Sequence, residues 1–478
     1  MHIIIIGAGP GGYETAVEAA KKGIEVTLVS EGPVGGTCLN EGCIPTKTLW
    51  KSASLLEEMR RAAEFGISAG TPGTDAEDGA VAPSIDLEKA MERKEAVTAQ
   101  LRAGIEFLLK NKLIRLVRGH ASFKAAEKGV CVTVCGAEGE CVCVTVCGAE
   151  GECEEICADK AIIASGSTPA TLPVEGKDLP GVLNTSELLD IREIPRRLCI
   201  IGAGVIGLEF ASIFRSFGSE VAVVEYCRDI LPRFDTDLAK RLKQQLGKKG
   251  INIETSAAVQ SIVAGEDGSL RVNYLKKDKE CSIEADRVLM AVGRRPRVDS
   301  LNLEAAGVEY GPKGIVTDGC MRTSNPDIYA IGDVRGKMML AHVASFEGKR
   351  ALNSILGEDA DDGIDFGIIP AAVFTLPEAA TVGLSEDECK LAGRAVRCSK
   401  SQYRSNGKAL SLGESEGWCK IVSDAESGEI LGCHLFGAHA SDLVHEIAAL
   451  MKCHAGLGEL HSLIHAHPTL AEVLMAAE

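Results

Sequence analysis

Two stretches of the chain show the same order of apolar and amphipathic segments. In the first, the apolar run Ile3–Ile6 leads into a glycine-rich turn, a helix-patterned segment at Tyr13–Lys22 and a second apolar run at Ile24–Val29. The same order recurs later over Leu198–Ile201, Leu208–Phe217 and Glu220–Val224. This order predicts strand, helix and strand joined by a crossover, and thus an α/β fold with parallel sheets.

The turn in each stretch carries three glycines with the spacing GxGxxG. In the first, Gly7 permits a tight turn, Gly9 lets the backbone approach a pyrophosphate, and Gly12 lets the helix pack close to the strand. The second turn has the same spacing at Gly202, Gly204 and Gly207. The motif alone is weak, but its position between a strand and a helix predicts two Rossmann-like dinucleotide-binding units. Two such units favour hydride transfer, with a flavin exchanging the electrons.

The residue that ends the second strand of each unit differs. Glu225 stands where a carboxylate accepts hydrogen bonds from both ribose hydroxyls, and it would repel a 2′-phosphate, so this unit should prefer NAD over NADP. In the first unit the corresponding residue is Ser30, with Glu31 next to it. Either the turn shifts so that Glu31 reaches the ribose, or Ser30 supplies a weaker contact.

A cysteine pair follows the first unit. Cys38 and Cys43 are separated by four residues, about one helical turn, which predicts side chains on one face and a sterically plausible disulfide. A helix N-terminus there would stabilise a thiolate and suit thiol–disulfide exchange. Two buried thiols could share this spacing by coincidence, but the flanking Gly35-Gly36-Thr37 and Ile44-Pro45-Thr46-Lys47 make that reading improbable.

Composition narrows the class of protein. The 478 residues suggest three or four domains, and the net charge of −17 argues against a nucleic-acid or anionic-membrane partner. No signal-peptide pattern and no apolar stretch long enough to cross a membrane is evident. The 18 cysteines allow a secreted disulfide protein, a metal protein or a reduced cytosolic protein. The N-terminal sequence favours a cytoplasmic location.

The cysteine segment resembles the redox-active segment of the pyridine nucleotide-disulfide oxidoreductases, and its Leu-Asn-x-Gly-Cys-Ile-Pro-Thr-Lys wording most resembles the dihydrolipoamide dehydrogenases among them. The resemblance extends over nearly the whole chain. Other matching motifs are Ile162–Ser167, Ala291–Pro296, Tyr329–Asp333, Leu340–His342 and His465–Glu472. It implies FAD and NAD as cofactors and oxidation of protein-bound dihydrolipoamide by NAD⁺, as the dehydrogenase component of a 2-oxoacid dehydrogenase or glycine cleavage system.

The resemblance also assigns roles to residues. Cys38 would exchange with substrate, Cys43 would face the flavin as the charge-transfer thiolate, and Lys47 and Glu209 would form an ion pair beside the flavin ring. Asp333 would bind the FAD ribityl or phosphate region and Ala341 the flavin edge. Further expected FAD contacts are Gly36, Thr37, Ser165 and Gly166. The nicotinamide nucleotide would be lined by Val259, Ala291, Gly293 and Arg294.

His467 is the expected base. Glu472 could reach back to it and fix the tautomer, so that the imidazole takes a proton from a dithiol near neutral pH. His465 is the competing choice, but the family motif puts the base directly before the proline. In that family the C-terminal histidine serves the other subunit's active site, which implies a homodimer. A lipoyl-bearing partner protein is also implied, since no lipoyl-bearing extension is expected before residue 1.

Four segments are predicted: an FAD domain at 1–165, an NAD domain at 166–290, a central segment at 291–365 and a dimerisation domain at 366–478. Two stretches depart from the family pattern. Residues 68–84 read as a surface loop, and residues 131–153 contain a twelve-residue repeat read as a duplicated hairpin. Its cysteines could be passive strand thiols, metal ligands or redox regulators. Their spacing does not fit a zinc knuckle, so passive thiols are expected and no metal site is assigned.

Three alternatives remain from the sequence. A related disulfide reductase of glutathione type would have a different amino-acid sequence after the second cysteine and would favour NADP. A mercuric reductase would need a C-terminal cysteine pair, which the ending Leu474–Glu478 lacks. A flavin-bearing binding subunit with an idle thiol site is disfavoured by the intact Cys38, Cys43 and His467.

Overall fold

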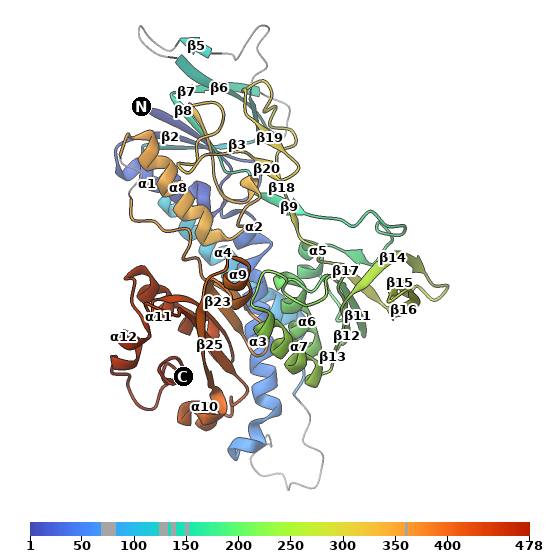
Figure 1. The fold of residues 1–478 in the computed structure, drawn as a ribbon. Coiled ribbons are helices and arrows are strands. Elements are labelled where there is room, and N and C mark those ends of the chain that lie inside the picture. The colour runs from blue at the N-terminus through green and yellow to red at the C-terminus, as the bar shows by residue number, and fades with distance from the viewer. Residues whose placement is uncertain (68–82, 124–131, 135–139, 149–152, 359–361) are drawn as a thin grey trace. The chain divides into compact units, whose positions relative to one another are not determined.

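The computed structural model describes residues 1–67, 83–123, 132–134, 140–148, 153–358 and 362–478 (Figure 1). Its chain divides into two compact units. The first contains Met1–Pro45, Glu92–Ala170 and Gly293–Ile364, and the second contains Thr46–Met91, Thr171–Val292 and Asp365–Glu478. Within the described ranges, no helix is both long and apolar enough to cross a membrane.

A five-stranded parallel sheet forms the centre of the first unit. Its strand order is β21-β8-β1-β2-β3, so that the N-terminal strand β1 lies in the middle. The strands are β1 (His2–Ile6), β2 (Glu25–Ser30), β3 (Ile114–Arg118), β8 (Lys160–Ile163) and β21 (Ile328–Ala330). Ile3, Ile4 and Ile5 have no exposed surface, which is why this run is apolar at successive positions rather than alternating.

Helices α1 (Pro10–Lys21) and α8 (Ala341–Ile355) pack against each other in this unit. A Cβ on Gly11 would lie 3.1 Å from the Ala344 side chain, and a Cβ on Gly348 would overlap the Thr15 hydroxyl. Small residues therefore allow the close approach. Short elements complete the unit: α2 (Gly36–Asn40), the antiparallel pair β9 (Ser167–Pro169) and β18 (Arg294–Pro296), β19 (Tyr310–Gly311), β20 (Gly314–Ile315) and η2 (Gly332–Arg335).

An antiparallel sheet in the first unit contains the repeated segment. Its central strand β6 (Glu140–Cys147) pairs with β4 (His120–Phe123) and β5 (Val132–Val134) on one side and with β7 (Cys153–Ala158) on the other. Cys147 and Cys157 each take part in a disulfide bond. For these two cysteines the expectation of passive thiols is wrong. The antiparallel register of β6 and β7 places Cys147 opposite Cys153 and Cys157 opposite Cys143. The linking residues 135–139 and 149–152 lie outside the described part.

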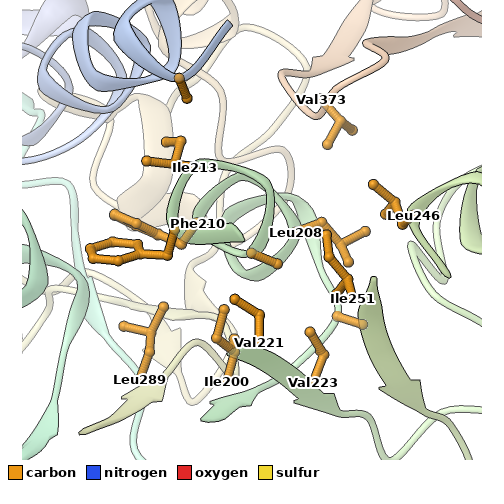
Figure 2. Close-up of a cluster of buried hydrophobic side chains, with 14 of the residues drawn as sticks. Ile200, Leu208, Phe210, Ile213, Val221, Val223, Leu246, Ile251, Leu289 and Val373 are labelled. Carbon is orange, nitrogen blue, oxygen red and sulfur yellow. The ribbon is translucent and has the colours of Figure 1, made fainter. Parts of the chain in front are cut away.

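A second parallel sheet, with order β10-β17-β11-β12-β13, forms one half of the second unit. Its strands are β10 (Val182–Leu183), β11 (Arg197–Ile201), β12 (Glu220–Val224), β13 (Ile251–Glu254) and β17 (Arg287–Met290). Helix α6 (Val205–Phe217) lies on this sheet, and its Leu208 and Phe210 belong to one buried cluster with Ile200, Val221 and Leu289, while Ile213 lies on the side of the helix away from the sheet (Figure 2). Helix α7 (Thr236–Lys248) adds Leu246 to the same cluster.

Three further groups of elements belong to or continue into the second unit. The antiparallel strands β14 (Ala257–Ala264), β15 (Leu270–Lys276) and β16 (Lys279–Ala285) form one sheet. Helices α3 (Cys43–Arg60) and α4 (Leu87–Leu108) each span a boundary between the two units. The remaining short helices of the region are η1 (Ala62–Phe65) and α5 (Thr185–Leu189).

The C-terminal segment is an antiparallel sheet with order β22-β23-β26-β25-β24, covered by helices. The strands are β22 (Ala371–Val373), β23 (Ala379–Gly383), β24 (Val396–Gln402), β25 (Trp418–Asp424) and β26 (Ile430–Phe436). The helices are α9 (Glu386–Leu391), η3 (Tyr403–Ser405), α10 (Gly407–Ser411), α11 (Ala440–Lys452), α12 (Leu457–Ser462) and α13 (Glu472–Met475).

A buried ion cluster ties this sheet to α7. Lys420 is 1% exposed, and its ammonium lies 2.7 Å from Asp235, 3.2 Å from Asp237 and 3.1 Å from Glu386. Burial lowers the pKa of Lys420, but the hydrogen bond to Asp235 and the charges of the other carboxylates outweigh that effect and raise it well above its usual range. Asp235 also accepts the N–H groups of Asp237 and Leu238 as the N-cap of α7.

The predicted α/β class with two Rossmann-like units and a C-terminal α/β domain is confirmed. The four-part division at residues 165, 290 and 365 stays a prediction. The expected loop at 68–84 falls almost wholly outside the described residues.

Candidate active site

The first glycine-rich turn lies between β1 and α1. Gly7 has φ +110°, and a Cβ there would lie 2.2 Å from the Ala164 carbonyl oxygen, while a Cβ on Gly12 would lie 1.8 Å from the Gly7 carbonyl oxygen. Both positions therefore exclude any side chain for reasons of packing. Gly9 differs, because the nearest atom to a Cβ there would be the Gly36 Cα at 4.0 Å. The space beside Gly9 is open toward a ligand.

The second turn, between β11 and α6, repeats this pattern. A Cβ on Gly202 would lie 2.4 Å from the Ala291 carbonyl oxygen, and a Cβ on Gly207 would lie 2.0 Å from the Gly202 carbonyl oxygen. By contrast, no atom lies within 4 Å of where a Cβ on Gly204 would be. Gly9 and Gly204 are the N-caps of α1 and α6, and neither helix start receives a side-chain cap. N–H groups at an uncapped helix start beside open space fit the phosphates of a dinucleotide.

The strand ends of the two units hold different side chains. Glu225 is 8% exposed, and its carboxylate accepts the backbone N–H of Ala203 and that of Cys227, each at 2.6 Å. It is thereby fixed beside the second turn. Ser30 is also buried, but its hydroxyl donates to the Gly32 carbonyl at 2.8 Å.

Glu31, which directly follows β2, lies beside two basic side chains. Its carboxylate pairs with Arg297 and lies 3.9 Å from the His120 imidazole. Arg118 donates to the Gly32 carbonyl in the same turn. In the first unit, therefore, the Glu31 carboxylate is ion-paired with Arg297, and the Ser30 hydroxyl is hydrogen-bonded to the backbone of the following turn.

The other expected FAD contacts gather in the first unit. A Cβ on Gly36 would lie 2.6 Å from the Gly9 Cα, so α2, which also holds Thr37, begins beside the first turn. Ser165 donates to the Arg297 carbonyl at 2.8 Å, and Gly166 has φ +78° with open space at its Cβ. Asp333 lies in η2, where it accepts the Ser167 hydroxyl at 2.5 Å. Ala341 is the first residue of α8.

The two cysteines lie on successive helices. Cys38 is in α2 and Cys43 is the first residue of α3, so the expectation of one shared helical turn is wrong. The chain turns between them at Gly42, where a Cβ would lie 2.9 Å from the Thr37 carbonyl oxygen. Cys38 is partly exposed and Cys43 is exposed. The expected position at a helix N-terminus holds for Cys43.

Arg294 lies in the same unit as the thiols. Its guanidinium donates to the Ser167 hydroxyl at 2.7 Å and to the Ser167 carbonyl at 2.8 Å. Burial lowers the pKa of Arg294, and the charges of Asp333, Glu41 and Cys43 oppose this shift. Gly293, which precedes it, has φ +116°, and a Cβ added there would meet no atom within 4 Å. Two other expected nucleotide contacts, Ala291 and Val259, lie in the second unit, with Val259 at a bulge of β14.

Lys47 and Glu209 form the predicted ion pair within the second unit. The Lys47 ammonium lies 2.8 Å and 2.7 Å from the two Glu209 oxygens, and the Glu209 side chain is 4% exposed. The backbone N–H of Phe374 donates to the same carboxylate at 3.0 Å, and the Lys47 ammonium lies 4.8 Å from the centre of the Phe374 ring. Sequence analysis missed Phe374, because nothing in its local sequence links it to residues so distant along the chain.

The structure separates the two candidate histidines. His467 Nδ1 lies 2.9 Å from Glu472, its side chain is 78% exposed, and Glu472 also accepts the Thr469 N–H at 2.8 Å. His465 is 6% exposed, with one ring nitrogen 2.8 Å from Glu446 and the other 3.1 Å from the Leu463 carbonyl. His467 thus presents Nε2 outward, whereas both nitrogens of His465 are engaged.

The chain belongs to the pyridine nucleotide-disulphide oxidoreductases. The family model of that description matches residues 1–348, and the model of its dimerisation domain matches residues 369–478. FAD and NAD(H) are the cofactors of this class, in agreement with the two open turns.

The chain is similar to dihydrolipoyl dehydrogenases along its whole length. It is 37% identical to one from Bacillus subtilis, over 100% of this chain and 98% of the relative, and 38% identical to one from Chlamydia muridarum, over 98% and 94%. Among solved structures, LpdA from Mycobacterium tuberculosis has a TM-score of 0.88 at 27% identity, over 100% of this chain and 98% of the other. The HOCl-induced flavoprotein disulfide reductase RclA from Escherichia coli has a TM-score of 0.83 at 26% identity, over 100% and 99%. The resemblance stated from the sequence is confirmed.

Proposed function

We propose that the protein catalyses oxidation of a dihydrolipoyl group by NAD⁺, giving the cyclic disulfide, NADH and one proton. The observation that carries this is the pair Cys38 and Cys43, with Cys43 at the start of α3, in a chain that matches dihydrolipoyl dehydrogenases throughout. The pair takes two electrons from the substrate dithiol by thiol–disulfide exchange, and the same two electrons leave as hydride to NAD⁺.

Each thiol has its own role in this proposal. Cys38 forms the mixed disulfide with substrate, and Cys43, at the N-terminus of α3, carries the thiolate. FAD, when bound, supplies two-electron transfer between Cys43 and the nicotinamide. Gly9, Gly36 and Thr37 would hold its pyrophosphate end, Asp333 and Ala341 would hold its ribityl and ring portions, and Lys47 and Glu209 would supply a charge pair beside its ring.

His467 removes the proton from the substrate dithiol. Glu472 fixes Nδ1 as the protonated nitrogen, leaving Nε2 to accept. The dimerisation domain supports a homodimer, and exposed Ile464 and Leu463, close in sequence to His467, offer apolar surface for it. In the assembled enzyme His467 of the partner subunit completes each site.

The second dinucleotide site selects NAD⁺. Glu225 is fixed beside Ala203, where it accepts ribose hydroxyls and repels a 2′-phosphate. Ala291, Val259, Gly293 and Arg294 complete this site in the proposal. A lipoyl-bearing protein of a 2-oxoacid dehydrogenase or glycine cleavage complex presents the dithiol. The proposal includes the cytoplasmic location expected from the sequence.

The test is turnover by the purified holoenzyme. Dihydrolipoamide with NAD⁺ should yield NADH, NADP⁺ should be a poor acceptor, and Cys43→Ser should abolish turnover. An exposed cysteine outside the site provides the matched control: Cys453→Ser should retain activity, because Cys453 is exposed, directly follows α11 and is not among the residues assigned to the site. Reduction of glutathione disulfide without any lipoamide activity would instead establish the alternative, a related disulfide reductase.

A further inference from the structure

Phe374 contacts both members of the Lys47–Glu209 pair. Its backbone N–H donates to Glu209 Oε1 at 3.0 Å, and its ring lies beneath the Lys47 ammonium at 4.8 Å from the ring centre. Lys47 lies in α3, Glu209 in α6, and Phe374 directly follows β22. One residue of the C-terminal segment therefore touches the carboxylate through its backbone and the ammonium through its side chain.

The pair needs such contacts because it is largely removed from water. Glu209 is 4% exposed at its side chain, and Lys47 is 29% exposed. A buried ion pair is well placed only when further hydrogen bonds satisfy the remaining lone pairs and protons. The Phe374 N–H satisfies a carboxylate lone pair, and the negative face of its ring attracts the ammonium.

The helix that carries Lys47 also holds the Phe374 ring. Trp50, three residues after Lys47 in α3, meets that ring edge-on at 5.7 Å with an interplanar angle of 79°. Trp50 Nε1 donates to the Thr375 carbonyl at 3.2 Å. Lys47 and Trp50 lie on one face of the helix at this spacing, so the two side chains enclose the ring between them.

We propose that Phe374 is a positioning residue, which fixes the Lys47 ammonium relative to the bound flavin and thereby sets the flavin's redox potential. This rests on the proposed function only in placing Lys47 beside the flavin ring. Loss of the ring frees the ammonium to move, which weakens its stabilisation of negative charge on the reduced cofactor. The flavin midpoint potential then becomes more negative and hydride transfer slows.

The experiment measures the flavin midpoint potential of the holoenzyme by spectroscopic titration against a reference dye. Phe374→Leu keeps the backbone N–H and most of the bulk but removes the aromatic face. We expect a more negative potential and a kcat lowered by about 3- to 30-fold, with KM for dihydrolipoamide unchanged. Phe374→Tyr should restore both values. Phe65→Leu is the matched control, because the Phe65 ring also lies near a cation, Arg61 at 5.9 Å, but touches no residue assigned to the site.

A double-mutant cycle with Lys47→Met separates positioning from packing. If Phe374 acts through Lys47, adding Phe374→Leu to Lys47→Met causes no further change in potential. An unchanged potential in Phe374→Leu, or an equal shift with and without Lys47, overturns the proposal. Should Phe374→Leu fold poorly, Trp50→Phe, which removes the hydrogen bond to Thr375 and reduces the contact with the Phe374 ring, is expected to shift the potential in the same direction. Because the potential is measured without lipoamide, its outcome is independent of whether dihydrolipoamide is the substrate.

Discussion

Alanine substitutions at the glycines of the second dinucleotide turn should affect ligand binding and folding differently. In Gly204→Ala the new methyl meets no atom within 4 Å, and the residue has φ −77°, which alanine adopts readily. Replacing an N-cap glycine by alanine lowers the free energy of unfolding by only about 0.5 kcal/mol. The variant should therefore fold normally.

Binding of NAD⁺ should suffer far more in the same variant. The methyl occupies the space in which phosphate oxygens would reach the N–H groups at the start of α6. Loss of one or two charge-assisted hydrogen bonds amounts to about 1.5–3 kcal/mol, which corresponds to a roughly 10- to 150-fold rise in the Kd for NADH. Fluorescence titration of NADH measures this Kd, and thermal unfolding measures the stability of the same sample.

Two matched variants complete the experiment. Gly207→Ala places its Cβ 2.0 Å from the Gly202 carbonyl oxygen, so it should lower the unfolding temperature, by a strain of about 1–3 kcal/mol. Gly247 lies in α7 with open space around it, so Gly247→Ala should raise the free energy of unfolding by about 0.5–1 kcal/mol without changing the NADH affinity. Unchanged NADH affinity in a folded Gly204→Ala would refute the assignment of this turn to a pyrophosphate.

Three further outcomes are expected. Lys420→Ala leaves Asp235 buried without its cation and should lower the free energy of unfolding by about 3–5 kcal/mol in urea, whereas Lys400→Ala, at an exposed ion pair, should change it little. Ser30→Glu should tighten FAD binding to the apoprotein about tenfold in a fluorescence titration, because a carboxylate there would match Glu225 in the second unit; weaker binding would contradict that parallel. Hydrogen bonds from the Thr469 N–H and then from His467 lower the pKa of Glu472, so its carboxylate stays charged as pH falls through the ordinary glutamate range. Glu472→Gln should therefore reduce kcat by roughly 10- to 100-fold at every pH from 6 to 9. A loss confined to acidic pH would count against this role.

The sequence predicted those parts of the site that depend on local pattern. Gly7, Gly12, Gly202 and Gly207 sit where backbone packing excludes a side chain, and local spacing is sufficient to reveal that requirement. His467 could be preferred over His465 because Glu472 follows at a distance from which its side chain reaches back. Both are short-range relations along the chain.

Relations between distant segments were beyond the reach of the sequence. The contact of Phe374 with Lys47 depends on how β22 and α3 pack, and the capture of Glu31 by Arg297 depends on where the chain emerges after β18. The prediction that Cys38 and Cys43 share one helical turn was wrong, because α2 ends at Asn40 and a new helix, α3, begins at Cys43. Helix boundaries of this kind are set by tertiary contacts rather than by residue spacing.

The central claim is that Cys38 and Cys43 exchange electrons with the bound flavin. Anaerobic reductive titration of the holoenzyme tests it most directly, with the visible absorbance of the flavin followed against added electrons. In the oxidised holoenzyme the flavin and a disulfide between Cys38 and Cys43 would each accept two electrons, so the protein should take up about four per flavin, and Cys43→Ser should take up about two. An uptake of two electrons by both proteins would contradict the claim.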